Sequence, residues 1–256
     1  MKVSDGSPTV LLPLLCLWAL LYWPATGWSA CEDPPARRVN WLRCDKQGVD
    51  LTGADLREAV LTQVNLTDAK LNRARLDGAD LGNAVLNGLD FANATLTNAR
   101  LVSAQLERAV FANASMAGAR LDRAVLRQAN LSHADLNGAR LYQADLTGAN
   151  LSGAKLDKAN LAQANLTDAK LPGVVLSGAT LSRAVLENAV LSGANLRGAK
   201  LDGANLLAVD FTGADLAEAT LADARVDGAR FTDAGLDSTI WVDRRRCRPG
   251  SVGECQ

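Results

Sequence analysis

Aromatic residues make up only 4 % of this 256-residue sequence, and its single histidine is His133. An excess of charge of one sign is also missing, because 27 lysines and arginines face 28 acidic residues. A core must therefore be built from aliphatic side chains, and general binding to polyanions is not indicated. The longest apolar run, Val10 to Trp23, has 14 residues and is too short to cross a membrane easily.

Catalytic motifs are missing as well. There is no GxSxG elbow, no Walker loop, no HExxH pair and no metal-spaced group of carboxylates. His133 stands between Ser132 and Ala134 and is expected to be a solvated surface side chain. We therefore predict that the protein is not an enzyme and has no catalytic residue, cofactor-binding residue, metal ligand or cofactor. Turnover that is abolished by a change at one surface position would contradict this prediction.

The N-terminal 30 residues have the features of a secretory signal peptide. Lys2 precedes the apolar run, and Pro24 and several small residues follow it up to Ala30. We predict a cleaved leader over residues 1–30 and export to the periplasm or the extracellular space, with an uncleaved anchor as the alternative. No membrane span is expected in the mature chain.

Four cysteines follow the leader, in two pairs at opposite ends: Cys31 with Cys44, and Cys247 with Cys255. An even number of cysteines in an exported chain favours disulfides, and we predict bonds within each pair because the two ends should lie far apart. A metal site is the alternative, although no CxxC spacing is present. Ser29-Ala30-Cys31 also resembles the end of a lipoprotein processing site, so a lipid on Cys31 remains an alternative that would leave Cys44 unpaired.

What the sequence has in abundance is a repeat of five residues. From Leu51 to Leu236 a large apolar residue recurs at every fifth position, here called the central position, which makes 38 repeats. The central residue is leucine in 32 repeats, and alanine stands two residues before it in 33. Side chains at every fifth position form no stripe on an α-helix, and on a flat strand they alternate between the two faces. Neither common element therefore explains the repeat.

The stretch ADLTGANLSGAKLDKANL, residues 144–161, shows the pattern clearly. It resembles the pentapeptide-repeat family, whose motif is A(D/N)LXX, and the resemblance covers residues 49–238. The resemblance implies an all-β fold, a right-handed quadrilateral parallel β-helix with one repeat on each side and four repeats in each coil. The 38 repeats would then form about 9.5 coils and a rod roughly 45 Å long, at the usual strand spacing.

The phenylalanines independently favour a coil of twenty residues. Phe91, Phe111, Phe211 and Phe231 all occupy central positions and are separated by 20, 100 and 20 residues. In a coil of four repeats they fall on one side of the rod as two adjacent pairs. We predict that every central residue points at one axis and that these four residues form a core stack.

Glycine or asparagine is frequent two residues after the central position, where a type II turn requires a positive φ. These residues fill seven of ten such corners after the side that contains Leu51 and Phe91, but two of nine after the side that contains Leu61 and Leu81. The latter corners are predicted to use a different turn more often.

The segments that flank the repeats are predicted to cap the coil. Residues 31–50 and 239–256 each contain one cysteine pair and one tryptophan, Trp41 or Trp241. We expect the tryptophan to cover the last apolar layer while the disulfide holds the cap; a ligand site at one tryptophan is the alternative. Similar flanks occur on some exported members of the family. The expected organisation is a leader (1–30), an N-terminal disulfide cap (31–50), the β-helix (51–238) and a C-terminal disulfide cap (239–256).

Two groups of charged residues stand out on the expected surface. Residues 20 apart stack in neighbouring coils, so Arg100, Arg120 and Arg140 should form a basic docking stripe with Arg123 nearby. Acidic residues gather toward the C-terminus: Asp210, Asp215, Glu218, Asp223, Asp227, Asp233 and Asp237. The simplest interpretation is a mixed solvated surface, and the alternative is a polar docking face for a partner.

Together these features predict a non-catalytic structural or protein-binding module outside the cytoplasm, with an unknown protein partner and no nucleic-acid ligand. The alternative comes from the family, because some cytoplasmic relatives are thought to imitate duplex DNA and bind a topoisomerase such as gyrase. Residues 51–238 carry 18 basic and 21 acidic residues. The resulting net charge of −3 is modest for a mimic of DNA.

Overall fold

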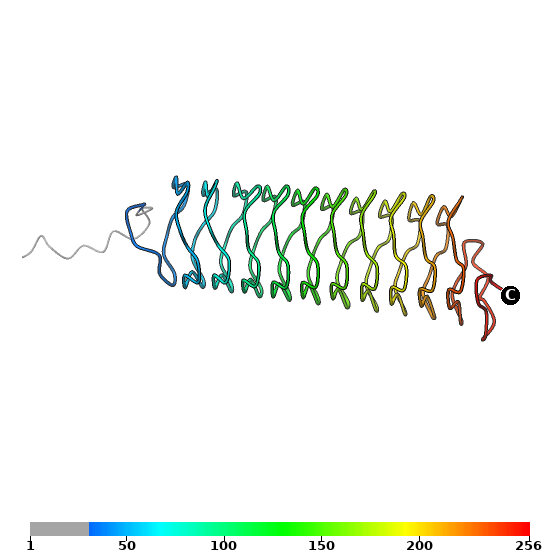
Figure 1. Ribbon diagram of the computed structural model, residues 1–256. Helices are drawn as coiled ribbons and strands as arrows, with labels where there is room; N and C mark the ends of the chain where they lie inside the picture. The colour runs from blue at the N-terminus through cyan, green and yellow to red at the C-terminus, as the bar shows by residue number, and fades with distance from the viewer. Residues whose placement is uncertain (1–30) are drawn as a thin grey trace, which may run out of the picture.

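The computed structural model describes residues 31–256, which form one rod of stacked four-sided coils (Figure 1). The coils follow one another in chain order from the blue N-terminal end to the red C-terminal end, with no loop inserted between them. The predicted signal peptide, residues 1–30, lies outside the described residues.

Each coil takes twenty residues, because the residue before each central position pairs with the residue twenty positions later. Parallel β-bridges of this kind run without interruption from Asn40↔Val60 to Thr220↔Ile240. The β-structure of each side is a single bridging residue, and residues 31–256 contain no helix and no longer strand. The same part of the chain accordingly has no helix that could cross a membrane. This register is the one that the phenylalanine spacing predicts.

Backbone hydrogen bonds explain why a five-residue unit can repeat so many times. The N–H groups of the central residue and of the corner residue donate to the following coil, as Leu151 does to the carbonyl of Lys170 at 2.7 Å. The residue before the central position donates to the preceding coil, and the alanine closes the turn, as Ala154 does on Leu151 at 3.0 Å. Four of the five N–H groups of a repeat are thus satisfied by other backbone groups.

The fifth N–H group, on the residue after the central position, explains the aspartate or asparagine of the motif. The side-chain oxygen of Asn165 accepts the N–H of Thr167 at 3.1 Å and the Thr167 hydroxyl at 2.7 Å. Asp210 accepts the N–H of Thr212 in the same way at 3.0 Å. These are Asx turns, which short acidic and amide side chains form readily. The role of this motif position was not predicted from the sequence.

Replacing Asn165 by valine tests this role of the motif. Val185 occupies the same register position in the next coil, so valine is sterically acceptable there. We expect Asn165→Val to lower the free energy of unfolding by about 1 kcal/mol, because the N–H of Thr167 loses its partner. The matched variant Val185→Asn should leave stability unchanged or raise it. Urea unfolding followed by circular dichroism measures both, and equal stability of Asn165→Val and wild type would contradict the assignment.

The core is a continuous column of inward-facing apolar side chains. The central leucines from Leu51 to Leu221 are fully buried or nearly so, and the alanines that precede them are buried along most of the rod. The rings of Phe91 and Phe111 stack with centroids 4.7 Å apart and planes 8° apart. Phe211 and Phe231 stack at 5.1 Å and 15°. Leucine fills the axis because the small alanine leaves room for it beside each corner.

The corner residues show no difference in the sign of φ between the sides for which different turns were predicted. Every corner from Arg38 to Ser238 has a positive φ, whatever its side chain: Gln63 has 57° and Gly203 has 65° on the side where a different turn was expected. Among residues 31–256, 27 residues other than glycine have a positive φ. Corner residues donate their N–H to the following coil where the chain turns to the next side, and they do so in the left-handed region. Stacking therefore imposes this conformation even where the residue opposes it.

Coil geometry begins earlier than residue 51, where the sequence analysis placed the boundary of the N-terminal cap. Trp41 is fully buried in a central position, and Cys44 occupies an alanine position. The ring N–H of Trp41 donates to the carbonyl of Asp33 at 3.1 Å. Cys31 and Cys44 form a disulfide with an S–S distance of 1.98 Å. An inward position requires an apolar side chain of suitable size, not the consensus residue, so the first coil forms from residues that do not match the motif.

The C-terminal segment folds back over part of the last coil. Its antiparallel bridges, Gly235↔Val252 and Ile240↔Arg246, cover two sides, and Cys247 and Cys255 are joined at an S–S distance of 2.06 Å. Trp241 is only half-buried and meets Phe231 edge-on at 5.1 Å. This cap therefore leaves part of the final layer open, and Phe231 remains partly exposed.

Candidate functional site

The inward-facing positions carry apolar side chains, which cannot act as acids, bases, nucleophiles or ligands. A functional site must therefore lie on the outside of the rod. The buried polar or charged residues within 31–256 are Asp122, Thr239 and Ser251, and the last two belong to the C-terminal closure. His133 is exposed at a corner with φ of 55°, and its ring lies over Gly153. The described residues contain no cluster of potential metal ligands.

The predicted basic stripe forms a continuous ladder on one side of the rod. Arg100 pairs with Arg120 and Arg120 with Arg140 through adjacent parallel bridges, with Asp80 before them and Asn160 after them. We call Arg100, Arg120 and Arg140, with the corner residue Arg123, the arginine ladder. Arg123 follows Arg120 by three residues and has φ of 58°. The structure thus brings the four residues onto one side and the corner that follows it.

The two ends of the arginine ladder are neutralised, whereas its middle is not. Arg100 forms an ion pair with Asp80, and Arg140 forms one with Asp122, both at 3.4 Å. The Asp122 side chain is only 9 % exposed, so the Arg140 guanidinium group pairs with a carboxylate that is nearly buried in the rod. Neither the Arg120 nor the Arg123 side chain has a hydrogen-bonding or ion-pair partner within the described part of the chain. Two guanidinium groups are therefore free to bind an external anion.

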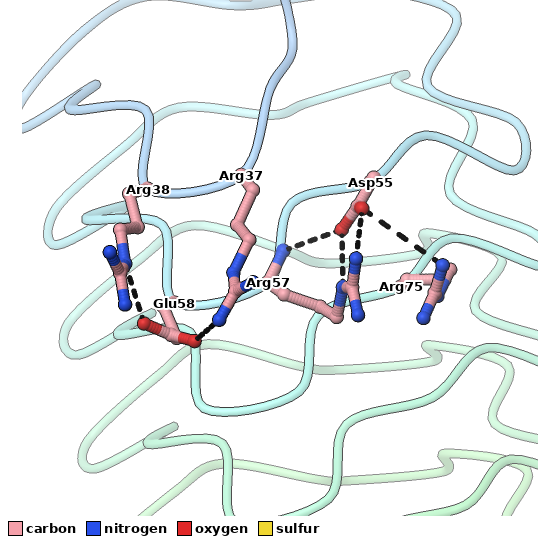
Figure 2. A network of polar contacts seen from close by, with 6 residues as sticks. All are labelled: Arg37, Arg38, Asp55, Arg57, Glu58 and Arg75. Atoms are coloured by element: carbon pink, nitrogen blue, oxygen red, sulfur yellow. Dashed lines mark hydrogen bonds and ion pairs between the residues drawn. The ribbon is translucent and has the colours of Figure 1, made fainter.

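A second charged group, at the N-terminal end, is fully paired (Figure 2). Glu58 accepts hydrogen bonds from Arg37 and, at 2.7 Å, from Arg38. Asp55 accepts from the Arg57 side chain at 2.7 and 2.5 Å and lies 3.9 Å from Arg75. The Arg57 hydrogen bond is the main cause that lowers the pKa of Asp55 to about 2. Hydrogen bonds from Arg37 and then Arg38 lower the pKa of Glu58. Because Arg37 and Arg38 precede Glu58 by one coil, the network stabilises the first coil.

Acidification should weaken this network. Both carboxyl groups have a lower pKa in the folded state than in the unfolded chain, so they stabilise the fold above about pH 4. That contribution is lost as the pH falls from about 4 toward 2. We expect the melting temperature of Asp55→Asn/Glu58→Gln to fall less steeply over this range than that of the wild type. Asp227→Asn, which removes an exposed carboxylate without an ion pair among residues 31–256, is the control. Parallel curves for all three proteins would contradict the expectation.

Arginines pair with four of the seven carboxylates in the acidic group near the C-terminus, whereas Asp227, Asp233 and Asp237 form no ion pair within residues 31–256. Arg197 pairs with Asp215 at 3.3 Å and with Glu218 at 3.1 Å. The carboxylates of Asp210 and Asp223 pair with Arg230 at 2.6 Å and Arg244 at 2.7 Å. Arg197 and Arg244 were not predicted as members of this group, because they lie 18 to 21 residues from their partners. An interval of about one coil between opposite charges was the signal that could have revealed them.

The open rim of the last coil was not anticipated from the sequence. A shallow depression there is lined by residues 229–233 and 252–254. It arises because the cap covers only part of the final layer, as described above. The depression mixes polar and apolar groups, and no charged side chain in it is buried.

Comparisons with known proteins agree with the coil geometry. A family model described as pentapeptide repeats matches in eight copies, within residues 47–83, 74–111, 104–143, 144–183, 171–207 and 194–233. Comparison with curated protein sequences finds no match.

Among solved structures, HetL from the cyanobacterium Nostoc sp. strain PCC 7120 is 34 % identical and has a TM-score of 0.73. The match covers 82 % of this chain and 92 % of HetL. A pentapeptide repeat protein from the Arabidopsis thaliana thylakoid lumen is 29 % identical over 43 % of this chain and 82 % of its own, with a TM-score of 0.38. The fluoroquinolone resistance protein QnrB1 is 18 % identical over 72 % of this chain and 92 % of its own, with a TM-score of 0.34. The similarity to HetL implies a right-handed β-helix. The match to the family model and the similarity to HetL, together with the five-residue repeat and the four-sided coil, show that the chain belongs to the pentapeptide repeat family.

Proposed function

We propose that this protein is a non-catalytic module that acts outside the cytoplasm by binding a protein partner through the side of its rod. The observation that carries the proposal is the arginine ladder, in which Arg100, Arg120 and Arg140 stack in adjacent coils and the central Arg120 has no side-chain partner among residues 31–256. A continuous hydrogen-bonded rod holds such groups at fixed spacing. This arrangement favours binding of a partner rather than catalysis. HetL, which is similar over most of this chain, is described as involved in the regulation of heterocyst differentiation.

The two disulfides support an extracytoplasmic location. Disulfides persist in oxidising compartments and are rare in the cytosol. The pairing of Cys31 with Cys44 favours a disulfide over a lipid at Cys31, because one sulfur atom cannot carry both.

Intact mass measurement of the protein purified from its native cell tests the location. We expect a chain that has lost the leader and whose four cysteines resist alkylation until they are reduced. Full-length protein whose five cysteines are all free thiols would contradict export, and a mass increase consistent with lipid on Cys31 would replace the disulfide by an anchor.

The partner is tested by site-specific photo-crosslinking. A crosslinker is placed in turn on each of the four sides of the rod, in the native cell, and the products are identified by mass spectrometry. We expect one protein to be captured reproducibly from the side of the arginine ladder. The absence of any product from all four sides would overturn the proposed function.

The alternative, a DNA mimic that binds gyrase, is addressed by a supercoiling assay. The arginine ladder opposes it, because positive groups stand in the middle of the rod where a mimic would present negative charge. We expect no effect of the purified mature protein on supercoiling, and inhibition at stoichiometric concentrations would favour the alternative.

A further inference from the structure

The last coil of the rod has a paired edge on two of its four sides and an unpaired edge on the other two. The cap pairs with the sides that contain Gly235 and Ile240. Along the remaining sides, residues 224–233, four N–H groups have no partner in the part of the chain that the structure describes: those of Val226, Gly228, Phe231 and Asp233. The carbonyls of Ala224 and Ala229 likewise accept no hydrogen bond from residues 31–256. We call this edge, residues 224–233, the open rim.

The equivalent groups of the preceding coil show what the open rim lacks. The N–H groups of Leu206 and Phe211 donate to the carbonyls of Arg225 and Arg230, each at 2.8 Å. The N–H of Arg225 donates in return to the carbonyl of Ala204 at 2.9 Å. Unpaired backbone groups along a sheet edge are a template for another strand, and addition of an extended peptide to such an edge is a common mode of recognition. The open rim therefore offers the hydrogen bonds by which each coil holds the next.

The apolar column is also exposed at the open rim. Val226 and Phe231 are central residues that are only partly buried, whereas Leu236 beneath the cap is buried. In the depression beside Phe231, Val252 is 57 % exposed, more than any other large apolar side chain of residues 31–256. The opposite end of the rod differs, because Trp41 fills its first layer and is fully buried. Exposed apolar groups next to an unpaired strand edge favour association with another chain.

Charges near the C-terminus indicate which side chains the missing layer would carry. The carboxylates of Asp210 and Asp223 pair with arginines about one coil later, at 2.6 and 2.7 Å. Asp227 and Asp233 are exposed on the open rim, where no following coil exists, and they form no ion pair within the described residues. Arg225 is the other charged residue of the rim without an ion pair in this part of the chain. Basic side chains one layer beyond the two aspartates would therefore be favoured.

A short segment can continue the coil over the open rim, whereas a second rod cannot. Another rod would need all four sides of the next layer, and the cap already occupies two of them through its bridges to Gly235 and Ile240. Two adjacent sides remain, which together take two five-residue repeats. The corner between them stacks on Gly228, which has φ of 69°. The residue placed there must therefore accept a positive φ, as glycine and asparagine do.

We propose that the open rim is a second binding site, separate from the side of the rod, which takes an extended segment of a partner protein by strand addition. The segment has about ten residues, runs parallel to the last coil and places one apolar side chain over Val226 and another over Phe231. Its carbonyls accept the four unpaired N–H groups, and its own N–H groups donate to Ala224 and Ala229. Basic side chains of the segment pair with the two exposed aspartates of the rim.

Two synthetic peptides of about ten residues test the proposal. The first contains two repeats, with leucine at both central positions, glycine at the corner between them, and lysine where a side chain would lie over Asp227 or Asp233. The second has the same sequence with N-methyl groups on the residues that would donate to Ala224 and Ala229, so it loses these hydrogen bonds and keeps every side chain. Binding to the mature protein is measured by fluorescence anisotropy. We expect the unmodified peptide to bind at one saturable site and at least tenfold more tightly.

Hydrogen exchange locates the bound peptide. Saturating amounts of the unmodified peptide should slow exchange of the four unpaired N–H groups of the open rim at least tenfold. The N–H of Gly213 is the control, because it already donates to the carbonyl of Thr232 at 2.8 Å. Its exchange rate should change less than about twofold.

Charge-reversal variants test the role of the aspartates at an ionic strength of about 0.15 M, where exposed charges more than about 8 Å apart are largely screened. Asp227→Lys/Asp233→Lys should reduce affinity for the unmodified peptide at least tenfold. The matched control is Glu187→Lys/Asp168→Lys, which makes the same change in net charge on the side of Asp227, two to three coils away. The control should alter affinity less than about twofold.

Three results would overturn the inference: equal binding of the two peptides, unchanged exchange at the open rim, or equal loss of affinity in the two double variants. A dimer in analytical ultracentrifugation that Val252→Lys abolishes would assign the open rim to a second copy of the chain and would also overturn it. Failure here is distinguishable from failure of the proposed function, because photo-crosslinking from the four sides reports a partner on the side of the rod, whereas the peptides report only its end.

Discussion

Leu151→Asp is expected to prevent folding of the central coils. Leu151 is fully buried at a central position in the middle of the rod, with apolar side chains of the two adjacent coils above and below it. Removing the leucine alone costs about 2–5 kcal/mol. An aspartate adds the cost of burying a carboxyl group with no hydrogen-bonding partner. The total approaches the whole stability of many domains, which is about 5–15 kcal/mol.

Circular dichroism and size-exclusion chromatography of the purified variant provide the measurement. We expect loss of the β-signal and an expanded or aggregated chain. Lys158→Asp is the control, because Lys158 is exposed at a nearby corner with φ of 56°, a conformation that aspartate tolerates better than lysine. A folded Leu151→Asp protein with the melting temperature of the wild type would show that the central positions do not face inward.

Phe111→Ala is expected to lower the free energy of unfolding by about 3–5 kcal/mol. Phe111 is fully buried, and its ring lies 4.7 Å from that of Phe91 in the preceding coil. Alanine would leave a cavity in the axial column and remove the stacked contact, which contributes about 0.5–1.5 kcal/mol beyond the buried area. Neighbouring coils cannot collapse into the cavity because backbone hydrogen bonds fix their separation.

Phe111→Leu distinguishes the effect of an empty cavity from the effect of losing a phenylalanine at this position. Leucine is the residue at most other central positions, so this variant should lose less than half as much stability. Urea titration with fluorescence of Trp41 and Trp241 as probes of the two ends gives the free energies and shows whether the ends unfold together. Equal destabilisation by alanine and leucine would contradict an effect that depends on the volume of the cavity.

The candidate site was predictable from the sequence as far as its register. The interval of twenty residues places Arg100, Arg120 and Arg140 in one ladder, because residues one coil apart stack in any four-sided coil. Which of these arginines is unpaired was not predictable. Asp122 neutralises Arg140 and not Arg120, and that choice depends on the direction of side chains in adjacent coils.

The same limit applies to the acidic group near the C-terminus, which the sequence indicated as part of a mixed solvated surface, with a docking face as the alternative. Asp215 and Glu218 lie far from Arg197 along the chain, so a count of charge in a local stretch of sequence does not include all three. Stacking of the coils nevertheless brings them together in ion pairs. Charges in a coil are neighbours at intervals of about twenty residues. A local count of charge therefore misjudges the surface wherever opposite charges lie one coil apart.

The sequence by itself determined the twenty-residue coil and the inward column of leucine, alanine and phenylalanine, because its repeat resembles that of a known family and its four phenylalanines are separated by multiples of twenty residues. Only the tertiary structure decided the turn at each corner and where the coil begins. Corner conformation is imposed by hydrogen bonds to the following coil, so Gln63 and Arg123 adopt a positive φ that their side chains do not favour. Trp41 and Cys44 join the first coil without matching the motif, because burial selects an apolar side chain that fits the available space.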